Sequence, residues 1–219
     1  MARDICAREG LRLNVYRPTI VYGDSRTGRT LRFNALYFPV KAAVYLRDIY
    51  LADIREKGGR KAAELGIRMT ESGGLVMPIR FEVANEGGIN LVPVDHCVRA
   101  FMAILEDGLD GGIYHIANSR KTKIEDLVAF GKRHFRLEGL VTCGPADFAG
   151  RPKNALELLY DSYLEIFRPY MQDLRTFEAA HAAPILKRRG IVCPEFDYEM
   201  FARSMDFAVQ VGWGTRLFS

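Results

Sequence analysis

Cysteine is scarce in this sequence, and its spacing excludes the usual cysteine-based sites. The 219 residues include four cysteines, no two of which form a C-x-x-C pair: Cys6, Cys97, Cys143 and Cys193. Zinc sites and the disulfide frameworks of small secreted domains both need closely spaced cysteines. The pattern therefore argues against a metal site of this kind and predicts a protein of the reducing cytoplasm.

Long apolar runs are missing as well. No stretch approaches the length of a helix that spans a bilayer. The amino-terminal residues 1–10 carry charges throughout and have no apolar core of the kind found in a signal peptide. The sequence has neither an internal repeat nor a low-complexity linker. We expect a cytoplasmic protein without a membrane span, folded as a single domain over residues 1–219.

The sequence also lacks a strong excess of charge of one sign. Its 31 lysines and arginines stand against 27 acidic residues, which gives a net charge of +4. The basic residues are dispersed, and the densest groups are Arg26/Arg29/Arg32 and Lys187–Arg189. Because nucleic-acid-binding proteins usually carry a basic stripe or tail, we expect no nucleic-acid partner.

What the sequence does contain is a strand followed by a polar loop, Leu11–Thr30. From Leu11 to Val15, apolar residues alternate with polar ones, which is the pattern of a half-buried strand. A second apolar run, Ile20–Tyr22, leads into the polar loop Gly23–Gly28. In open α/β folds, ligands bind at the carboxyl ends of the strands. The loop is therefore the first candidate for a ligand site.

Two known loop motifs are close to this segment. Gly23–Thr30 nearly matches the phosphate loop G-x-x-x-x-G-K-[ST], with Arg29 in the place of the lysine. Arginine is not an equivalent point charge, and the run Leu91–Asp95, which could hold magnesium, is interrupted by Pro93. A nucleotide-binding phosphate loop at 23–30 is therefore the less favoured alternative. The segment around Ser25 misses the G-x-S-x-G motif of serine hydrolases by one residue.

Helical spacing and breaker residues predict several helices. They are the end of a helix at residues 2–9 closed by Gly10, a helix from Pro39 to Gly58–Gly59, a helix capped by Asp95, a helix opened by a capping box at Thr122–Glu125, and a last helix capped by Asp197, with Phe196 and Phe201 as a hydrophobic staple. The expected inward face of the helix after Asp95 is formed by Val98, Phe101, Met102 and Leu105.

Fewer strands are expected after the opening segment. Leu75–Val83 is predicted to be an edge or irregular strand because it contains Pro78. A turn is expected at Asn85–Gly88 and a short strand at Gly112–Asn118. From about Leu140 the pattern is mostly helical, with an aromatic face at Leu156, Tyr160, Tyr163 and Phe167. The order of elements predicts an α/β fold with a helical cap.

Three motifs in order carry a resemblance to a known family. They are R-P-T-I-V-Y-G-D-S-x-T-G at Arg17–Gly28, N-L-V-P-V-D at Asn90–Asp95 and G-I-Y-H-I-A-N at Gly112–Asn118. The chain resembles the extended short-chain dehydrogenase/reductases of the NAD-dependent epimerase/dehydratase type. It is most similar to the "male sterility" branch with acyl-thioester and fatty-acyl reductases. The resemblance implies a partial Rossmann-type sheet in residues 1–139 and a mostly helical substrate-binding cap in residues 140–219.

The departures from the family pattern concern the cofactor and the chemistry. The chain contains no G-x-x-G-x-x-G turn for a dinucleotide. The family's catalytic Tyr-x-x-x-Lys would fall upstream of Met1, and the spacing at Tyr37–Lys41 is interpreted as a chance match interrupted by Pro39. The resemblance therefore implies a C-terminal, substrate-binding half with no catalytic residue of its own. We expect it to be inactive alone and to bind neither NAD nor NADP tightly, although the complete family uses one of them.

The resemblance also assigns candidate site residues. Those expected beside the nicotinamide are Pro18, Thr19, Ile20 and Val21, for which a buried strand bent at a proline is the structural alternative. Those expected in a substrate-side loop are Gly23, Asp24, Ser25 and Thr27, for which an ordinary polar turn is the alternative. Tyr37, Arg80 and Asn90 are further candidates for the pocket, against exposed or capping roles. His115 is interpreted as a core histidine, and no metal site is expected.

The expected partners follow from this interpretation. The substrate would be a small molecule or an acyl thioester. A face left uncovered by the missing half favours self-association, so we expect a homodimer or association through that face. A non-catalytic module that binds a ligand or partner is the alternative function.

Overall fold

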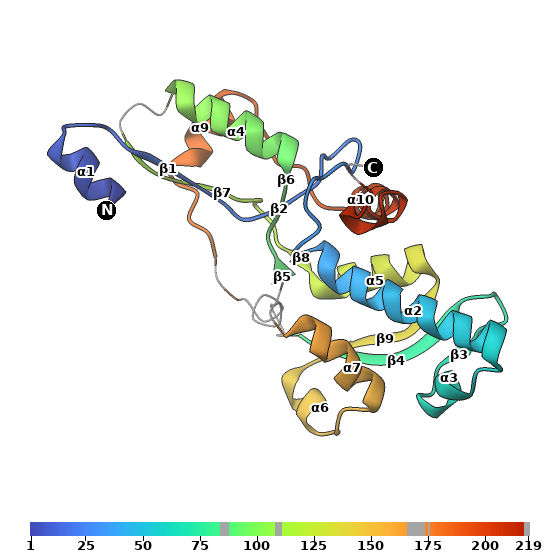
Figure 1. The fold of residues 1–219 in the computed structure, drawn as a ribbon. Coiled ribbons are helices and arrows are strands. Elements are labelled where there is room, and N and C mark those ends of the chain that lie inside the picture. The colour runs from blue at the N-terminus through green and yellow to red at the C-terminus, as the bar shows by residue number, and fades with distance from the viewer. Residues whose placement is uncertain (84–87, 108–110, 166–173, 175, 217–219) are drawn as a thin grey trace. The chain divides into compact units, whose positions relative to one another are not determined.

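The computed structural model describes residues 1–83, 88–107, 111–165, 174 and 176–216 (Figure 1). The chain forms two compact units that interleave along the sequence. The first unit contains Met1–Thr30, Asn90–Lys121 and Arg175–Ser204, and the second contains Leu31–Ile89, Thr122–Leu174 and Met205–Ser219. Each unit uses segments from both sides of residue 140, and the expected division of a single domain at 139/140 stays a prediction.

The first unit is built on short parallel strands. β1 (Asn14–Pro18) lies beside β7 (Gly112–Ile116), and β2 (Ile20–Tyr22) lies beside β6 (Leu91–Pro93) (Figure 1). The helix α4 (Val94–Asp107) connects β6 to β7, which is the crossover that parallel strands require. The helices α1 (Ala2–Arg8) and α9 (Ala182–Arg188) also belong to this unit.

The chain changes its strand partner between Pro18 and Thr19. The amide of Thr19 still donates to Ile116 in β7, at 3.0 Å, whereas the amide of Ile20 donates to Asn90 before β6, at 3.2 Å. Pro18 precedes this change of partner. Because proline has no backbone N–H, it could not donate a hydrogen bond to a neighbouring strand in any case. The expected strand–loop segment is therefore present, but it begins at Asn14 rather than Leu11 and consists of two consecutive strands.

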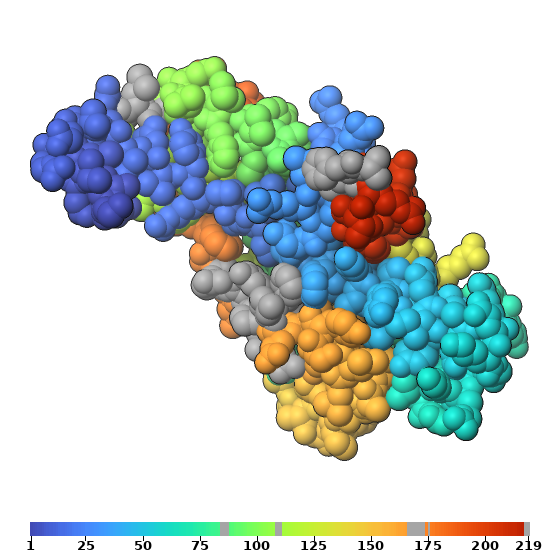
Figure 2. Space-filling model, in the orientation of Figure 1, coloured from blue at the N-terminus to red at the C-terminus, as the bar shows by residue number. Residues whose placement is uncertain are grey.

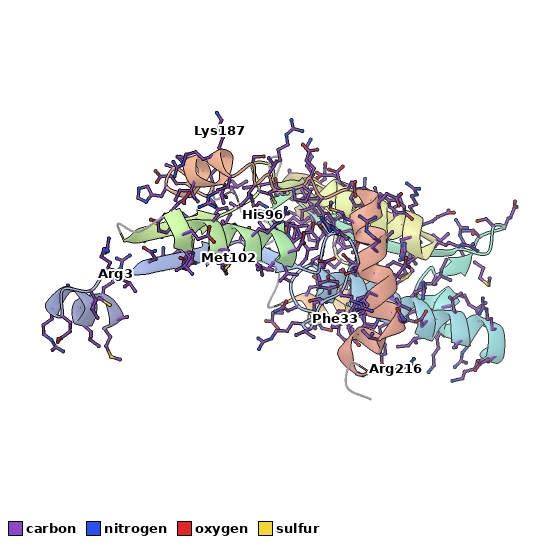
Figure 3. All side chains as sticks on the ribbon, turned by 90° about the horizontal axis from the view of Figure 1, so that it is seen from above. Arg3, Phe33, His96, Met102, Lys187 and Arg216 are labelled. Carbon is purple, nitrogen blue, oxygen red and sulfur yellow. The ribbon has the colours of Figure 1, made fainter. Side chains whose placement is uncertain are left out.

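The packing of α4 differs from the expectation. Its buried positions are Cys97, Ala100, Ala103 and Ile104, which join Val92, Ile116 and Ile185 in one cluster. The expected inward residues Val98, Met102 and Leu105 are 51–56% exposed, and the surface of α4 (green) is uncovered in Figure 2. His96 and Met102 lie on different sides of the helix (Figure 3). The expectation was wrong because it placed the largest apolar residues of α4 inward. The small side chains of Ala100 and Ala103 face inward instead, and they allow the helix to lie close to the sheet.

The second unit has a three-stranded sheet in the order β3 (Arg68–Met69), β4 (Leu75–Glu82) and β9 (Leu137–Cys143). β4 is antiparallel to β3 and parallel to β9, and its register with β9 shifts between Val76 and Ile79. The shift confirms the irregularity expected from Pro78. β9 itself was not expected, since the pattern from about Leu140 looked helical.

The other elements of the second unit are mostly helices. They are α2 (Tyr37–Lys57), α3 (Arg60–Glu64), α5 (Ile124–Phe135), α6 (Pro145–Ala149) and α7 (Ala155–Leu164), with the antiparallel pair β5 (Gly88–Ile89) and β8 (Thr122–Lys123). The helix α10 (Tyr198–Gln210) extends from the first unit into the second, and the short 3-10 helix η1 (Gly212–Gly214) follows it. The chain is thus α/β with small parallel sheets. None of the helices in the described ranges is long and apolar enough to cross a membrane.

Several local signals are confirmed. Gly10 and Gly58 have left-handed backbones just after α1 and at the end of α2, with φ of 65° and 75°. Pro39 lies in the first turn of α2. Asp197 caps α10 by accepting the Met200 amide at 2.8 Å. The rings of Phe196 and Phe201 are 6.5 Å apart, as the staple requires.

One capping box was expected at the wrong place. Thr122 belongs to β8, and α5 begins at Ile124 without a side-chain cap. The capping box of the structure is at Asn154 and Glu157, each of which accepts the other's amide, at 2.8 and 2.9 Å. The expected turn at Asn85–Gly88 and the contribution of Phe167 fall at least partly outside the described residues.

Candidate functional site

The loop Gly23–Gly28 lies between the carboxyl end of β2 and residues that lead to α2. It is organised by the carboxylate of Asp24, which accepts the amides of Arg26 and Thr27 at 3.0 and 2.8 Å and the Thr27 hydroxyl at 2.8 Å. Partial burial raises the pKa of Asp24, but these hydrogen bonds outweigh it and hold the pKa below its ordinary value. The loop is therefore a built turn around an ionised carboxylate.

A second carboxylate fixes the loop to the start of α4. Asp95 accepts the amide of Ser25 on one oxygen and its hydroxyl on the other, both at 2.9 Å. Asp95 is thus not the helix cap that we expected, because α4 already begins at Val94 and the carboxylate points to the loop. The guanidinium of Arg203 donates to the Ser25 carbonyl at 3.1 Å and ties α10 to the same residue.

Close packing fixes the end of the loop. Gly28 has a φ of 69°, and a Cβ there would lie 2.3 Å from the Arg203 carbonyl oxygen. Only glycine fits such a backbone against another main chain. The loop is therefore held rigidly against α10 at this point.

These contacts contradict the phosphate-loop alternative. The amides of Ser25, Arg26 and Thr27 bind carboxylates, the Asp24 amide donates to Arg29 at 2.9 Å, and the Gly28 amide donates to Asp24 at 2.8 Å. A phosphate loop needs these groups free to hold phosphate oxygens, and a helix directly after it. Here α2 begins only at Tyr37. The alternative is wrong because the loop's own donors are satisfied within the protein.

A buried polar cluster joins the three motif segments. The Asn90 side chain accepts the Thr19 hydroxyl at 2.9 Å and the Asn118 amide at 2.8 Å, and it donates to the Asn118 carbonyl at 2.8 Å. Asn118 in turn donates to the carbonyls of Leu91 and Pro194, at 3.3 and 2.9 Å. Both asparagines are 7% exposed. We call Thr19, Asn90 and Asn118 the asparagine cluster.

The cluster changes the interpretation of two candidates and adds one residue. Thr19 and Asn90 are engaged with protein groups, so their side chains organise the strand ends rather than face solvent. Asn118 is the last residue of the motif Gly112–Asn118, but the sequence did not indicate it as a site residue. Its position as the last residue of that motif, after a strand, was the signal that could have identified it.

Among the nicotinamide candidates, Pro18 and Val21 are exposed, Val21 to 36%.

The candidates Tyr37 and Arg80 belong to the second unit. Tyr37 is 1% exposed at the start of α2. The Arg80 guanidinium makes a two-point ion pair with Glu157, at 2.7 and 2.8 Å, and donates to the Pro152 carbonyl at 2.9 Å. Burial raises the pKa of Glu157, but the bonds from Arg80 and Asn154 outweigh it and lower the pKa. Arg80 therefore links β4 to α7, and its expected role in a pocket stays a prediction.

No further catalytic group is indicated within the described ranges. No set of three or more His, Cys, Asp and Glu side chains there could hold a metal ion. His115 is half-buried on β7, with Nδ1 2.8 Å from the Glu178 carbonyl oxygen. Lys41 follows Tyr37 by one helical turn in α2, on the far side of Pro39. All four cysteines are free thiols.

Comparison with solved structures identifies the fold. The chain is similar to the terminal R domain of the myxalamid PKS-NRPS pathway, with a TM-score of 0.62, 16% identity and coverage of 95% of this chain and 46% of that chain. It is similar to a thiolation-reductase di-domain of an archaeal non-ribosomal peptide synthetase, with a TM-score of 0.56, 15% identity and coverage of 96% and 38%.

A third similar structure is the dTDP-glucose 4,6-dehydratase DesIV of Streptomyces venezuelae with NAD and TYD bound, with a TM-score of 0.51, 13% identity and coverage of 97% and 48%. The chain thus spans about half the length of these proteins or less. A search of the curated proteins gives no significant match. Residues 1–101 match the family described as "Male sterility protein". The family match is confined to this segment, and the chain has a partial Rossmann-like fold similar to that of the reductase and dehydratase structures.

Proposed function

We propose that this chain is the substrate-binding half of an NAD(P)-dependent reductase or dehydrogenase, of the epimerase/dehydratase or acyl-thioester reductase type. The observation that carries the proposal is the convergence of the three motif segments. The asparagine cluster joins the carboxyl ends of β1 and β7 to the start of β6, and Asp95 holds the loop Gly23–Gly28 at the carboxyl ends of β2 and β6. This is the sheet edge where ligands of open α/β folds bind.

The residues of the chain would form one wall of such a site. Pro18 and Val21 are exposed beside the asparagine cluster and are available to a planar ring, while Ser25 and Thr27 present a fixed polar edge to a substrate. The same residues do not fit the pyrophosphate of a dinucleotide, since the loop amides are already bonded within the protein. We therefore assign no step of hydride transfer to this chain alone and propose that a glycine-rich half must come from elsewhere.

Calorimetric titration of the isolated chain tests the proposal. NADPH should give no tight binding, whereas octanoyl-coenzyme A, as a thioester probe, should bind and should bind more weakly to Ser25→Ala. The control is Ser162→Ala, which removes an exposed hydroxyl on α7 that bonds only its own helix. Tight NADPH binding, or thioester binding that is absent or indifferent to Ser25, would contradict the proposal.

A second candidate function is a non-catalytic ligand-binding module, and one cavity favours it. The cavity has a volume of about 270 Å³ and lies between α1 and the β1–β7 pair, lined by Arg3, Cys6, Ala7, Leu11, Leu13, Val15, Gly112 and Ile113. Arg3 (labelled in Figure 3) is its charged residue. An apolar space with one cation suits a small anionic amphiphile. Binding of octanoate that Val15→Trp abolishes and Ser25→Ala leaves intact would favour this function over the first.

A further inference from the structure

The main-chain donors from Asp24 to Gly28 are all engaged within the chain. These five consecutive amides donate either to the carboxylates of Asp24 and Asp95 or to main-chain carbonyls, at 2.8–3.0 Å. The structure describes every residue of this stretch, and none of its amides is left over for a ligand. A substrate that contacts this part of the loop must therefore bond a side chain or a carbonyl oxygen.

The two hydroxyl groups of the loop are engaged as donors too. Ser25 Oγ is 2.9 Å from Asp95 Oδ2, and Thr27 Oγ1 is 2.8 Å from Asp24 Oδ1. A hydroxyl group has a single proton, and an ionised carboxylate only accepts hydrogen bonds. Each hydroxyl therefore donates its proton to the carboxylate, and only lone pairs remain on its oxygen.

These lone pairs are available to a ligand. Ser25 Oγ accepts no hydrogen bond from any described residue, and Thr27 Oγ1 accepts only the Arg29 amide, at the longer distance of 3.4 Å. A hydroxyl oxygen has two lone pairs. Ser25 is half-buried and Thr27 is exposed. This polarity results from bonds within the loop and to the start of α4, so it does not depend on what else borders the loop.

We propose that Ser25 and Thr27 are specificity-determining residues that bind a neutral hydrogen-bond donor of the substrate. The inference rests on the proposed function, which places a substrate against this loop. A carbonyl oxygen in the same position would meet only lone pairs, and an acceptor that loses water without gaining a donor is unfavourable. The thioester carbonyl should therefore point away from the two hydroxyls. An acyl thioester has two sources of a suitable donor, an amide N–H on its thiol arm and a hydroxyl on its acyl chain.

Asp95→Asn should reverse the polarity of the Ser25 hydroxyl. The carboxamide of asparagine has one oxygen, which accepts, and one NH2 group, which donates. The Ser25 amide can only donate, so the oxygen should keep that bond and the NH2 group should face the hydroxyl oxygen. The hydroxyl proton is then released and can be donated to a ligand. The variant should consequently favour a carbonyl oxygen where the wild type favours an N–H or O–H group.

Two matched pairs of small thioesters test the proposal by calorimetric titration of the chain. S-octanoyl-N-acetylcysteamine is compared with the analogue in which an ester oxygen replaces the amide N–H. The 3-hydroxyoctanoyl thioester of N-acetylcysteamine is compared with the 3-oxooctanoyl thioester. In at least one pair, the wild type should bind the donor-bearing member about tenfold more tightly. The pair that discriminates identifies the source of the donor.

The variants link this ratio of affinities to the hydroxyls. Ser25→Ala should bring the ratio close to one, Thr27→Val should reduce it, and Asp95→Asn should reverse it. Ser162→Ala, on α7, is the control and should keep the ratio of the wild type. Circular dichroism of each variant confirms that it is folded, and Ser25→Ala and Thr27→Val carry the test where Asp95→Asn does not fold.

The outcomes separate this inference from the proposed function. A wild type that binds the thioesters but discriminates within neither pair would overturn the inference alone. Tighter binding of the ester or 3-oxo probe would also overturn it and would indicate the exposed guanidinium of Arg26 or Arg29 as the contact. Absence of binding by all four thioesters would overturn the proposed function together with the inference.

Discussion

Asp95 receives both hydrogen bonds that Ser25 can donate, from its amide and from its hydroxyl, each at 2.9 Å. The two residues are 70 positions apart and come from the loop after β2 and the first turn of α4. The pair therefore fixes the candidate substrate loop to the sheet edge. The stability of these two hydrogen bonds decides whether the loop is held in one conformation before a substrate binds or is mobile.

We expect Asp95→Ala to destabilise the chain and loosen this loop. The substitution leaves the half-buried Ser25 amide without an acceptor, which costs about 1–3 kcal/mol of unfolding free energy. Chemical denaturation measures this loss. Arg99→Ala is the control, since its guanidinium is 3.8 Å from the same carboxylate and is half exposed. It should change the free energy by less than about 0.5 kcal/mol. Equal effects of the two substitutions would contradict the assigned role of Asp95 as the hydrogen-bond acceptor for Ser25.

Gly28→Ala should destabilise the chain strongly, by about 3 kcal/mol or more. The new Cβ would need a left-handed backbone and would also overlap the Arg203 carbonyl oxygen, only 2.3 Å away. Gly58→Ala is a matched control, because Gly58 has the similar φ of 75° and no atom within 4 Å of a Cβ. It should cost only the backbone strain, about 1 kcal/mol. Thermal and denaturant unfolding of both variants would separate the close contact from the strain.

Local sequence signals predicted the ends of several elements. Gly10, Gly58, Pro39 and the staple around Asp197 act within a few residues of themselves, so the sequence was sufficient to place them. The box expected at Thr122 has the same local pattern as the one that forms at Asn154. It failed because Thr122 and Lys123 pair with β5, more than 30 residues away in sequence. Pairing of that kind cannot be read from a short window.

Nonlocal contacts also explain what was missed. β9 contains Glu138 and Gly139 near its start, which weakens any strand pattern. Gly139 has a φ of 75°, and a Cβ there would lie 2.8 Å from the Met77 carbonyl oxygen, at the register shift of β4. Only the neighbouring strand explains this glycine. The same holds for the site, where the sequence indicated the loop and the motif ends but not the asparagine cluster, whose members Asn90 and Asn118 are 28 residues apart.

The ion pair between Arg80 and Glu157 should be important for the second unit. The side chains are 17% and 2% exposed, and each has further hydrogen bonds. Glu157→Gln should lower the unfolding free energy by about 3 kcal/mol, because it leaves a largely buried guanidinium without its counter-charge. Glu64→Gln breaks the exposed pair with Arg60, at 3.7 Å. It should cost less than about 0.5 kcal/mol. Similar losses in both variants would show that Arg80 finds another partner or reaches water.

His96 should make the stability of the chain depend on pH. The side chain is 1% exposed on α4. Its burial, followed by the nearby charge of Arg99, lowers the pKa, while Asp95 and the backbone of Val192 oppose the shift less strongly. The folded pKa therefore lies below the unfolded value of about 6.5. As the pH falls below that value, the unfolded chain binds a proton that the folded chain does not.

The unfolding free energy should then fall with pH, by up to about 1.4 kcal/mol per pH unit from this group, until the folded pKa is reached. Denaturation midpoints measured from pH 7.5 down to pH 5 test this. His96→Gln should remove that part of the slope, even if it lowers the stability at neutral pH. His181→Gln, which replaces an exposed histidine, should keep the slope. A slope that persists in His96→Gln would assign the pH dependence to the carboxylates, whose titration lies lower.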